Sequence, residues 1–354
     1  MMRYAGAAVL ACALAAATQA VEAKTVKITA IGAPPPIVTN VRVVREYVIP
    51  EVNRRIAASG QDFKIEWREA WAQSLANFNE TFEAVENNIA QFGMIISGFE
   101  ESKLPLEQYT AMVPFHGLDG AKLGAIDQAI RAKVPEMSQA YLRHNQVFLS
   151  AAASDTFGLL TKFPVRKFED LEGKKIGTTG SWGHMLRGTK AVAVTSSMAD
   201  AYTNIRNGVY DGYISAVSLS FPYKIDEAAP NYTVVNFGGI VSSSLTVNKA
   251  TWDEFPEFAR TIFREVARGW SDRYVRITTE SGKNFVGLME KRGAKFAPLA
   301  AAERRKWASA MPNVPKEWAD NLDKRGQPGT KLLAAFMDAL RGSGAEVVRN
   351  WDRE

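Results

Sequence analysis

The sequence predicts an α/β fold with two lobes of the periplasmic-binding-protein type, each built on a mixed sheet, and one long helix that spans both lobes. Short apolar runs alternate with helical patterns in the first part of the chain, and a second such alternation follows after residue 151. An amphipathic stretch at 251–293 is too long for one small domain. The 354 residues, of which 46% are hydrophobic, provide enough apolar side chains for two cores.

Residues 1–23 have the three-part pattern of a secretory signal peptide, with cleavage predicted after Ala23. The apolar run 5–17 is too short to span a bilayer. Cys12, the only cysteine, lies within this segment. A lipoprotein modified at Cys12 is the alternative, but it leaves a short hydrophobic segment before the cut. We therefore expect an exported periplasmic protein without disulfides or thiolate metal sites.

The net charge of +5 does not predict a nucleic-acid partner, because basic residues are interspersed with acidic ones. The chain has no HExxH, GxSxG or Walker sequence, and the glycine-rich run 177–183 does not have the spacing of a dinucleotide loop. We therefore expect a monomer that binds no metal and no cofactor and is not an enzyme.

The first lobe is predicted at 24–150, and part of 237–293 returns to it. Strands and helices alternate here at spacings that favour a mainly parallel sheet, in which ligands bind at the carboxyl ends of the strands. Trp71 and Ser97 lie at such ends and are candidate ligand contacts. The predicted strands are 26–31, 63–67 and 92–96, and the predicted helices are 40–58 and 79–89.

The second lobe is predicted at 151–250. A jointed helix at 125–143 leads to strands 147–152 and 157–161, where the chain crosses between lobes. The second alternation comprises strands 175–178, 191–194 and 210–215 with helices 183–190 and 197–206, followed by return strands 234–237 and 244–247.

The long helix is predicted within the stretch 251–293, with Pro256 at its first helical position and Gly293 at its end. About 37 residues make a helix of roughly 55 Å, longer than a small domain is wide. The alternative is two helices that are broken at Gly269 or Gly282. Residues 294–354 are predicted to wrap the lobes with helices at 301–310, 316–324 and 329–340.

The chain resembles the solute-binding proteins of tripartite ATP-independent periplasmic (TRAP) transporters. The matching residues run in order along the chain and are Phe163-Pro164-Val165, Asp170-Leu171-Glu172-Gly173-Lys174-Lys175-Ile176, Ala201-Tyr202, Asn207-Gly208-Val209-Tyr210-Asp211-Gly212, Val247-Asn248-Lys249 and Thr251-Trp252-Asp253; Gln73, Leu75, Glu83, Glu86 and Pro114-Phe115 lie upstream. The resemblance implies two lobes that close on a small organic acid, delivery to the sodium-driven TRAP membrane subunits, and no catalysis.

The family's usual arginine, which pairs bidentately with a ligand carboxylate, is replaced here by Gly177. A second arginine is missing at Phe157-Gly158, and Ser215 replaces a common asparagine. We expect hydroxyl groups and the start of the predicted helix near Gly183 to hold an anion instead. The candidate ligand contacts in this lobe are Phe157, Thr178, Thr179, Trp182, Arg187 and Ser215.

Because several candidates are aromatic, we expect an aromatic acid or another monocarboxylate as ligand. Arg187 has two interpretations: it turns inward to replace the lost arginine, or it lies on the outer face of its helix. Two further alternatives stay open for the whole protein, namely a periplasmic ligand-sensing domain of the same fold and a solute-binding protein of an ABC transporter.

Overall fold

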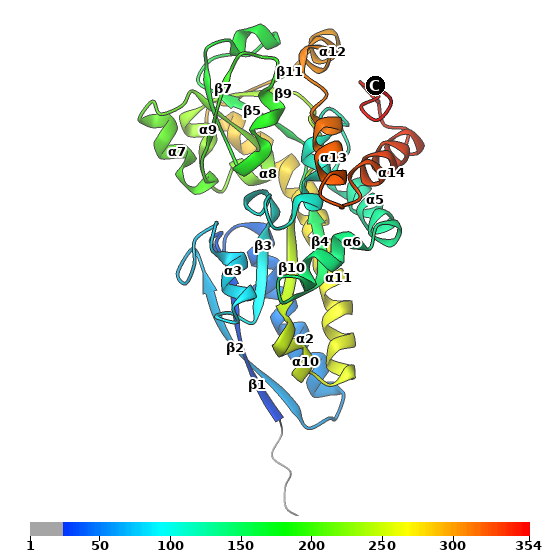
Figure 1. The fold of residues 1–354 in the computed structure, drawn as a ribbon. Coiled ribbons are helices and arrows are strands. Elements are labelled where there is room, and N and C mark those ends of the chain that lie inside the picture. The colour runs from blue at the N-terminus through cyan, green and yellow to red at the C-terminus, as the bar shows by residue number, and fades with distance from the viewer. Residues whose placement is uncertain (1–23) are drawn as a thin grey trace, which may run out of the picture.

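The computed structural model describes residues 24–354, which fold into two α/β lobes (Figure 1). The first lobe contains a five-stranded sheet of order β2-β1-β3-β10-β4, and the second a six-stranded sheet of order β11-β9-β5-β8-β6-β7. The predicted two-lobed α/β fold is therefore confirmed. The predicted signal peptide lies outside the described residues.

The first sheet has a parallel core, as its strand and helix spacing predicts. Strand β1 pairs in parallel with both β2 and β3, and β10 runs antiparallel between β3 and β4. The carboxyl ends of β1, β2 and β3 consequently meet at the edge that faces the second lobe. The strands are β1 Lys24–Gly32, β2 Phe63–Trp71, β3 Phe92–Ile96, β4 Gln146–Ala153 and β10 Val241–Asn248.

One helical run follows β1 and comprises α1 (Thr39–Val43), the π-helical η1 (Val44–Val48) and α2 (Ile49–Ala58). The backbone stays right-handed at both junctions, so these elements form one continuous rod. Valines at helical spacing bury one face of the rod in the first core. The next helix, α3 (Thr81–Glu86), is shorter than the predicted 79–89.

The second sheet is mixed. Strand β8 pairs in parallel with β6 and antiparallel with β5, and β9 joins β5 to β11, a strand that the sequence did not predict. The strand predicted at 234–237 lies three residues earlier in the structure, as β9. The elements are β5 Phe157–Thr161, η4 Phe168–Leu171, β6 Lys175–Thr178, β7 Val192–Thr195, α7 Met198–Arg206, β8 Gly212–Ala216, α8 Val217–Ser220, α9 Ile225–Ala228, β9 Asn231–Val234 and β11 Lys295–Pro298.

The helix predicted at 183–190 is wrong. The chain forms instead the short 3₁₀ element η5 (Gly180–Leu186). Gly180, the first residue of this element, and Gly188, just beyond its end, have positive φ angles of 47° and 87°. These left-handed residues prevent a regular α-helix from forming across them, so the expected helix N-terminus at Gly183 does not exist.

Three segments connect the lobes: 154–156 between β4 and β5, 235–240 between β9 and β10, and the long helix. The first two are hydrogen-bonded to each other, since the N–H of Ser154 donates to the carbonyl of Ile240 and the N–H of Phe157 to that of Gly238. The first crossing lies just beyond β4, so the predicted lobe boundary after residue 150 falls inside that strand.

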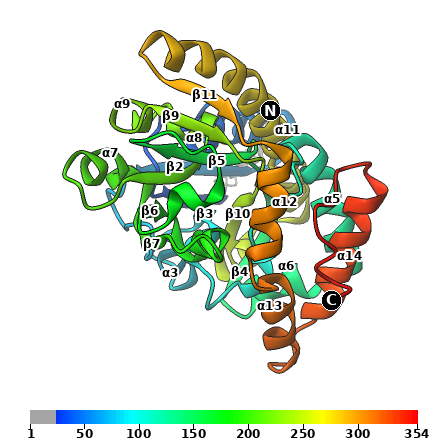
Figure 2. The ribbon, with the colours of Figure 1, turned by 90° about the horizontal axis from the view of Figure 1, so that it is seen from above.

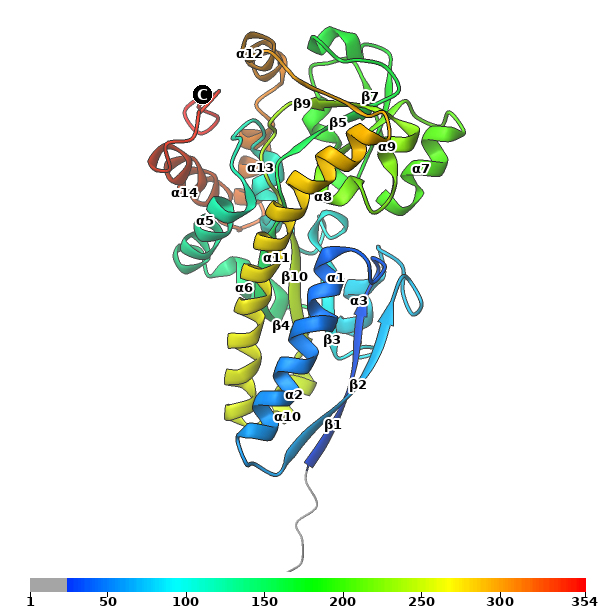
Figure 3. The same ribbon diagram turned by 180° about the vertical axis from the view of Figure 1, so that it is seen from behind.

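The long helix is α11 (Glu257–Lys291), a single element of 35 residues. It packs against α1, α2 and β4 of the first lobe and α8 of the second (Figure 3). The alternative of two helices broken at Gly269 or Gly282 is wrong. A Cβ at Gly269 would meet the hydroxyl of Tyr47, so a larger residue there would require the tyrosine side chain to move. The helix starts later than 251 because Pro256 makes Phe255 extended and so separates α10 (Lys249–Glu254) from it.

The last helices pack beside the second lobe, where α14 contacts α4 and α5 and α12 contacts η4 (Figure 2). Within residues 24–354, no helix is both long and apolar enough to cross a membrane. The remaining elements are η2 Ser97–Phe99, η3 Pro105–Gln108, α4 Tyr109–Met112, α5 Gly120–Lys133, α6 Glu136–Leu142, α12 Ala301–Ala310, α13 Val314–Asp323 and α14 Gly329–Gly342.

Candidate functional site

A cleft lies between the lobes at the carboxyl ends of β1 and β3, and residues of both lobes line it. Its free space is about 50 Å³, far below the roughly 300 Å³ of an ordinary ligand pocket, so the lobes are closely apposed here. The lining residues of this interlobe cleft are Pro34, Val38, Asn40, Phe78, Ile96, Phe99, Thr179, Trp182, Met198, Leu219, Tyr223, Ser242 and Ser243.

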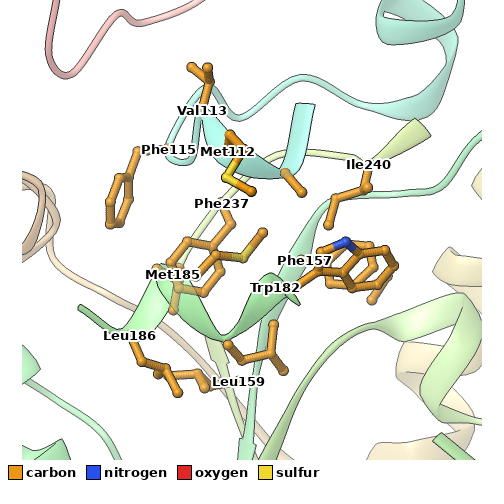
Figure 4. Close-up of a cluster of buried hydrophobic side chains, with 14 of the residues drawn as sticks. Met112, Val113, Phe115, Phe157, Leu159, Trp182, Met185, Leu186, Phe237 and Ile240 are labelled. Carbon is orange, nitrogen blue, oxygen red and sulfur yellow. The ribbon is translucent and has the colours of Figure 1, made fainter. Parts of the chain in front are cut away.

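Trp182 and Thr179 are the sequence-predicted site residues that line the cleft. The indole of Trp182 is 2% exposed and meets the ring of Phe157 edge to face, with centroids 5.4 Å apart. Figure 4 shows the two rings side by side, one carried by η5 and the other by β5. Thr179 Oγ1 lies 3.1 Å from the hydroxyl of Tyr213, which fixes the threonine side chain. Phe157 therefore supports the cleft wall from behind.

Trp182 also forms the contact between the lobes. A Cβ added to Gly98, in η2 of the first lobe, would lie 2.7 Å from Cζ2 of Trp182. A Cβ added to Gly180 would collide with the carbonyl oxygen of Gly98. Two glycines and one indole thus let the lobes approach backbone to backbone at this point.

The two candidates in the first lobe lie beside the cleft but do not line it. The hydroxyl of Ser97 donates to the carbonyl of Val241 at 3.1 Å, so it ties η2 to β10. Trp71 packs its ring against Gly32 and donates its indole N–H to the carboxylate of Glu69. Both side chains stabilise the edge of the sheet that carries the cleft.

The structure places three further candidates away from the cleft. Arg187 is exposed and pairs with Glu317 of α13 at 2.8 Å, which agrees with the outer-face interpretation. Ser215 is fully buried, and its hydroxyl donates to the carbonyl of Ala216. Thr178 is fully buried behind η5, and among the described residues its hydroxyl has no hydrogen-bond partner.

Three polar residues of the cleft were not singled out from the sequence. They belong to the first lobe but come from segments that are far apart in the sequence. Asn40 is the second residue of the first helix, and Ser242 and Ser243 lie on β10, about two hundred residues later. Asn40 Nδ2 donates to Ser243 Oγ at 3.2 Å. The signal that could have found Asn40 is its place at the start of a helix that follows the first strand end. The rings of the apolar lining residues Phe78 and Phe99 are in contact, with centroids 5.2 Å apart and planes tilted by 38°.

The cleft is uncharged: its lining contains no lysine, arginine, histidine, aspartate or glutamate. No group of His, Cys, Asp and Glu side chains within residues 24–354 has the geometry of a metal site. This site can therefore bind a small molecule through hydrogen bonds from neutral donors and through apolar contact with aromatic side chains.

Glu100 lies next to the cleft residue Phe99 and is almost fully buried. Burial raises the pKa of this carboxyl group from 4.5 to about 8, against the attraction of Lys103. Lys103 forms ion pairs with Glu83 and Glu86, so its positive charge does little to stabilise an ionised Glu100. Glu100 is consequently protonated at neutral pH.

We expect the protein to lose stability as the pH rises from about 5 to 8, by at most about 1.4 kcal/mol per pH unit for this one proton. The folded state holds the proton of Glu100 more tightly than the unfolded state, so the contribution is largest below pH 4.5 and is lost as the pH rises to about 8. The Glu100→Gln variant should flatten the dependence in urea unfolding at several pH values, whereas Glu101→Gln, at the exposed neighbour, should keep the wild-type slope. Identical slopes in all three proteins would contradict the assignment.

Comparison with known proteins agrees with the fold. Residues 58–321 match the bacterial extracellular solute-binding proteins of family 7. The C4-dicarboxylate-binding periplasmic protein of Rhodobacter capsulatus is 28% identical over 150 residues, which are 42% of this chain and 43% of that protein. The chain thus matches less than half the length of this relative.

Several solved structures share the fold. A TRAP solute-binding protein of Rhodoferax ferrireducens with copurified benzoate is 14% identical, with a TM-score of 0.78 over 90% of this chain and 98% of that one. A Bordetella pertussis extracytoplasmic solute receptor binding pyroglutamic acid is 19% identical, with a TM-score of 0.75 over 90% and 100%. A Chromohalobacter salexigens protein with bound D-glucuronate is 17% identical, with a TM-score of 0.76 over 87% and 99%.

The family match covers more than half of the chain, and the common fold extends over nearly all of it. The chain belongs to the bacterial extracellular solute-binding proteins of family 7.

Proposed function

We propose that this protein is a periplasmic receptor that captures a small organic acid by closure of its two lobes and delivers it to the membrane subunits of a TRAP transporter. The observation that carries the proposal is the interlobe cleft, whose lining comes from both lobes and is uncharged. A ligand that contacts both lobes stabilises the closed state, which is how binding drives closure. Membership of a solute-binding family supports a receptor and not an enzyme.

We propose further that the ligand is an aromatic acid or another monocarboxylate. Phe78, Phe99, Trp182 and Tyr223 provide aromatic walls, which suit a flat apolar body. No cation is present in the lining to pair with a second carboxylate, and burying an unpaired carboxylate is costly. Benzoate, pyroglutamate and D-glucuronate, found with structural relatives, all carry a single carboxylate; glucuronate differs from the other two by its several hydroxyl groups. The site candidates Thr179 and Trp182 would contact this ligand directly.

A thermal-shift screen tests the proposal. At a ligand concentration a hundred times Kd, binding to the folded state alone adds about 2.7 kcal/mol to its stability and raises Tm. We expect monocarboxylates with an aromatic or other apolar remainder to raise Tm, and C4-dicarboxylates and the hydroxyl-rich uronates to have little effect. If dicarboxylates gave the larger shift, the ligand class would be wrong; if no acid gave a shift, the receptor function itself would be contradicted.

A further inference from the structure

We infer that the second lobe recognises the polar end of the ligand through two hydroxyl groups with opposite hydrogen-bonding roles: Tyr223 donates to the carboxylate, and Thr179 accepts from a hydroxyl or N–H group of the ligand. The ligand is then a monocarboxylate that carries a hydrogen-bond donor of its own, such as a hydroxy acid. The inference rests on the proposed function, because it names the kind of acid that the interlobe cleft selects.

The hydroxyl of Thr179 has only lone pairs left for a ligand. Tyr213 donates its hydroxyl hydrogen to the carbonyl of Ser196 at 2.8 Å, and a carbonyl oxygen cannot donate. Because a hydroxyl has one hydrogen, Tyr213 must be the acceptor in its 3.1 Å contact with Thr179 Oγ1. This contact therefore uses the hydrogen of Thr179. Thr179 lines the cleft, and the oxygen that it offers to a ligand there is an acceptor.

The hydroxyl of Tyr223 has the complementary role. Tyr223 lines the cleft from the second lobe, and no residue that the structure describes forms a hydrogen bond with its hydroxyl. Burial raises the pKa of this phenol above its usual value, and no hydrogen bond opposes the shift, so the group stays protonated at neutral pH. A desolvated donor without a partner costs stability, which an acceptor on the ligand restores. A carboxylate is the stronger acceptor because it is charged.

The turn that carries Tyr223 is anchored to the long helix. The N–H of Lys224 donates to the carbonyl of Phe221 at 3.1 Å and closes a turn around Tyr223. The ring of Phe221 stacks on that of Phe285 in α11, with centroids 4.2 Å apart, and the guanidinium of Arg292 lies over the Phe221 ring at 4.3 Å. A group that is already held in place loses little freedom when a ligand binds, which favours affinity.

The two hydroxyl groups together distinguish acids by their hydrogen-bond pattern. An acid without a further donor can satisfy Tyr223, but it leaves the lone pairs of Thr179 desolvated without a partner. An acid with one hydroxyl or N–H in reach satisfies both groups. Sites that are built to hydrogen-bond a particular ligand group reject the analogue that lacks it, because their own polar groups are then left unpaired.

Pairs of acids that differ by one donor test the inference in the wild-type protein. Isothermal titration would compare mandelate with phenylacetate, phenyllactate with phenylpropionate, and para-hydroxybenzoate with benzoate. The donor lies at a different place relative to the carboxylate in each pair. We expect the acid with the donor to bind at least about tenfold more tightly in one pair or more.

Two substitutions separate the roles of the hydroxyl groups. Thr179→Val removes the acceptor at nearly constant shape, so the preference within the selective pair should fall below about threefold. Tyr223→Phe removes the donor, so both acids should bind at least about tenfold more weakly while the preference remains. Thr178→Val, which removes a fully buried hydroxyl without a partner, and Tyr202→Phe, on α7 outside the cleft, are the matched controls. Both controls should bind like the wild type, and Tm without ligand should be close to the wild-type value in all four variants.

Equal affinities within every pair overturn the inference and leave the proposed function intact, because the wild type then binds acids irrespective of a donor. A preference that survives Thr179→Val, or full affinity of Tyr223→Phe, also overturns it, as do equal losses in the control variants. If the wild type binds no acid of the panel or of the thermal-shift screen, the inference and the proposed function are both overturned.

Discussion

Replacing Gly180 by alanine should weaken ligand binding by about 100-fold or more, because closure would no longer be possible. The added Cβ would meet the carbonyl oxygen of Gly98 across the lobe interface. The open protein can avoid this collision and should fold normally, apart from the strain of a left-handed alanine at φ 47°. Titration calorimetry measures the affinity, and the radius of gyration from X-ray scattering, with and without ligand, reports closure.

Gly208→Ala is the control for this experiment. Gly208 is also left-handed, at φ 73°, but an added Cβ meets nothing within 4 Å. It should show the same backbone strain without loss of affinity. If Gly180→Ala bound the ligand as tightly as Gly208→Ala and contracted on binding, the glycine contact would not be part of the ligand-bound state.

Replacing Arg131 by alanine should lower the free energy of unfolding by about 3–5 kcal/mol, the usual loss when one partner of a buried ion pair is removed. The side chain of Arg131 is 9% exposed and donates two parallel hydrogen bonds to Glu107, at 2.7 and 2.6 Å, and a third to Asp127 at 2.8 Å. Tyr109 donates to the other oxygen of Asp127. Without Arg131, two carboxylates remain buried between α5 and η3.

Urea unfolding and calorimetry measure this loss, which corresponds to a Tm lower by roughly 4–7 °C. The matched control is Lys190→Ala, which removes a pair with Glu172 whose side chains are 73% and 56% exposed. Such a surface pair contributes little, so the change should stay below about 1 kcal/mol. Equal effects of the two substitutions would contradict the role assigned to the buried network.

Secondary-structure elements whose signals come from residues close together in the sequence were predictable. Strands β3, β5 and β6 occur at the predicted residues, because apolar runs bounded by turn residues determine where a strand begins and ends. The long helix was predictable for the same reason, since its apolar stripe persists through three glycines. Pro256, predicted at the first helical position, lies directly before Glu257, the first residue of the helix.

The candidate site was predictable only in part. Thr179 and Trp182 follow a strand end, a position that marks ligand sites in α/β sheets, and both line the cleft. Ser97 and Ser215 also follow or end strands, but their hydroxyls bond to backbone carbonyls, a choice that depends on which strands lie beside them. The anion-binding helix expected at Gly183 does not form. Its place is taken by η5, in which Gly180 is left-handed and contacts Gly98 of the first lobe.

The sequence by itself determined the two alternating α/β segments, the single long helix and the family, because each depends on local periodicity or on short motifs in order. Only the tertiary structure decided which polar groups meet in the cleft. Asn40 and Ser243 are 203 residues apart and become neighbours because β10 returns from the second lobe to lie beside β3. Proximity of this kind is created by strand order and lobe closure, and neither is encoded in the spacing of residues along the chain.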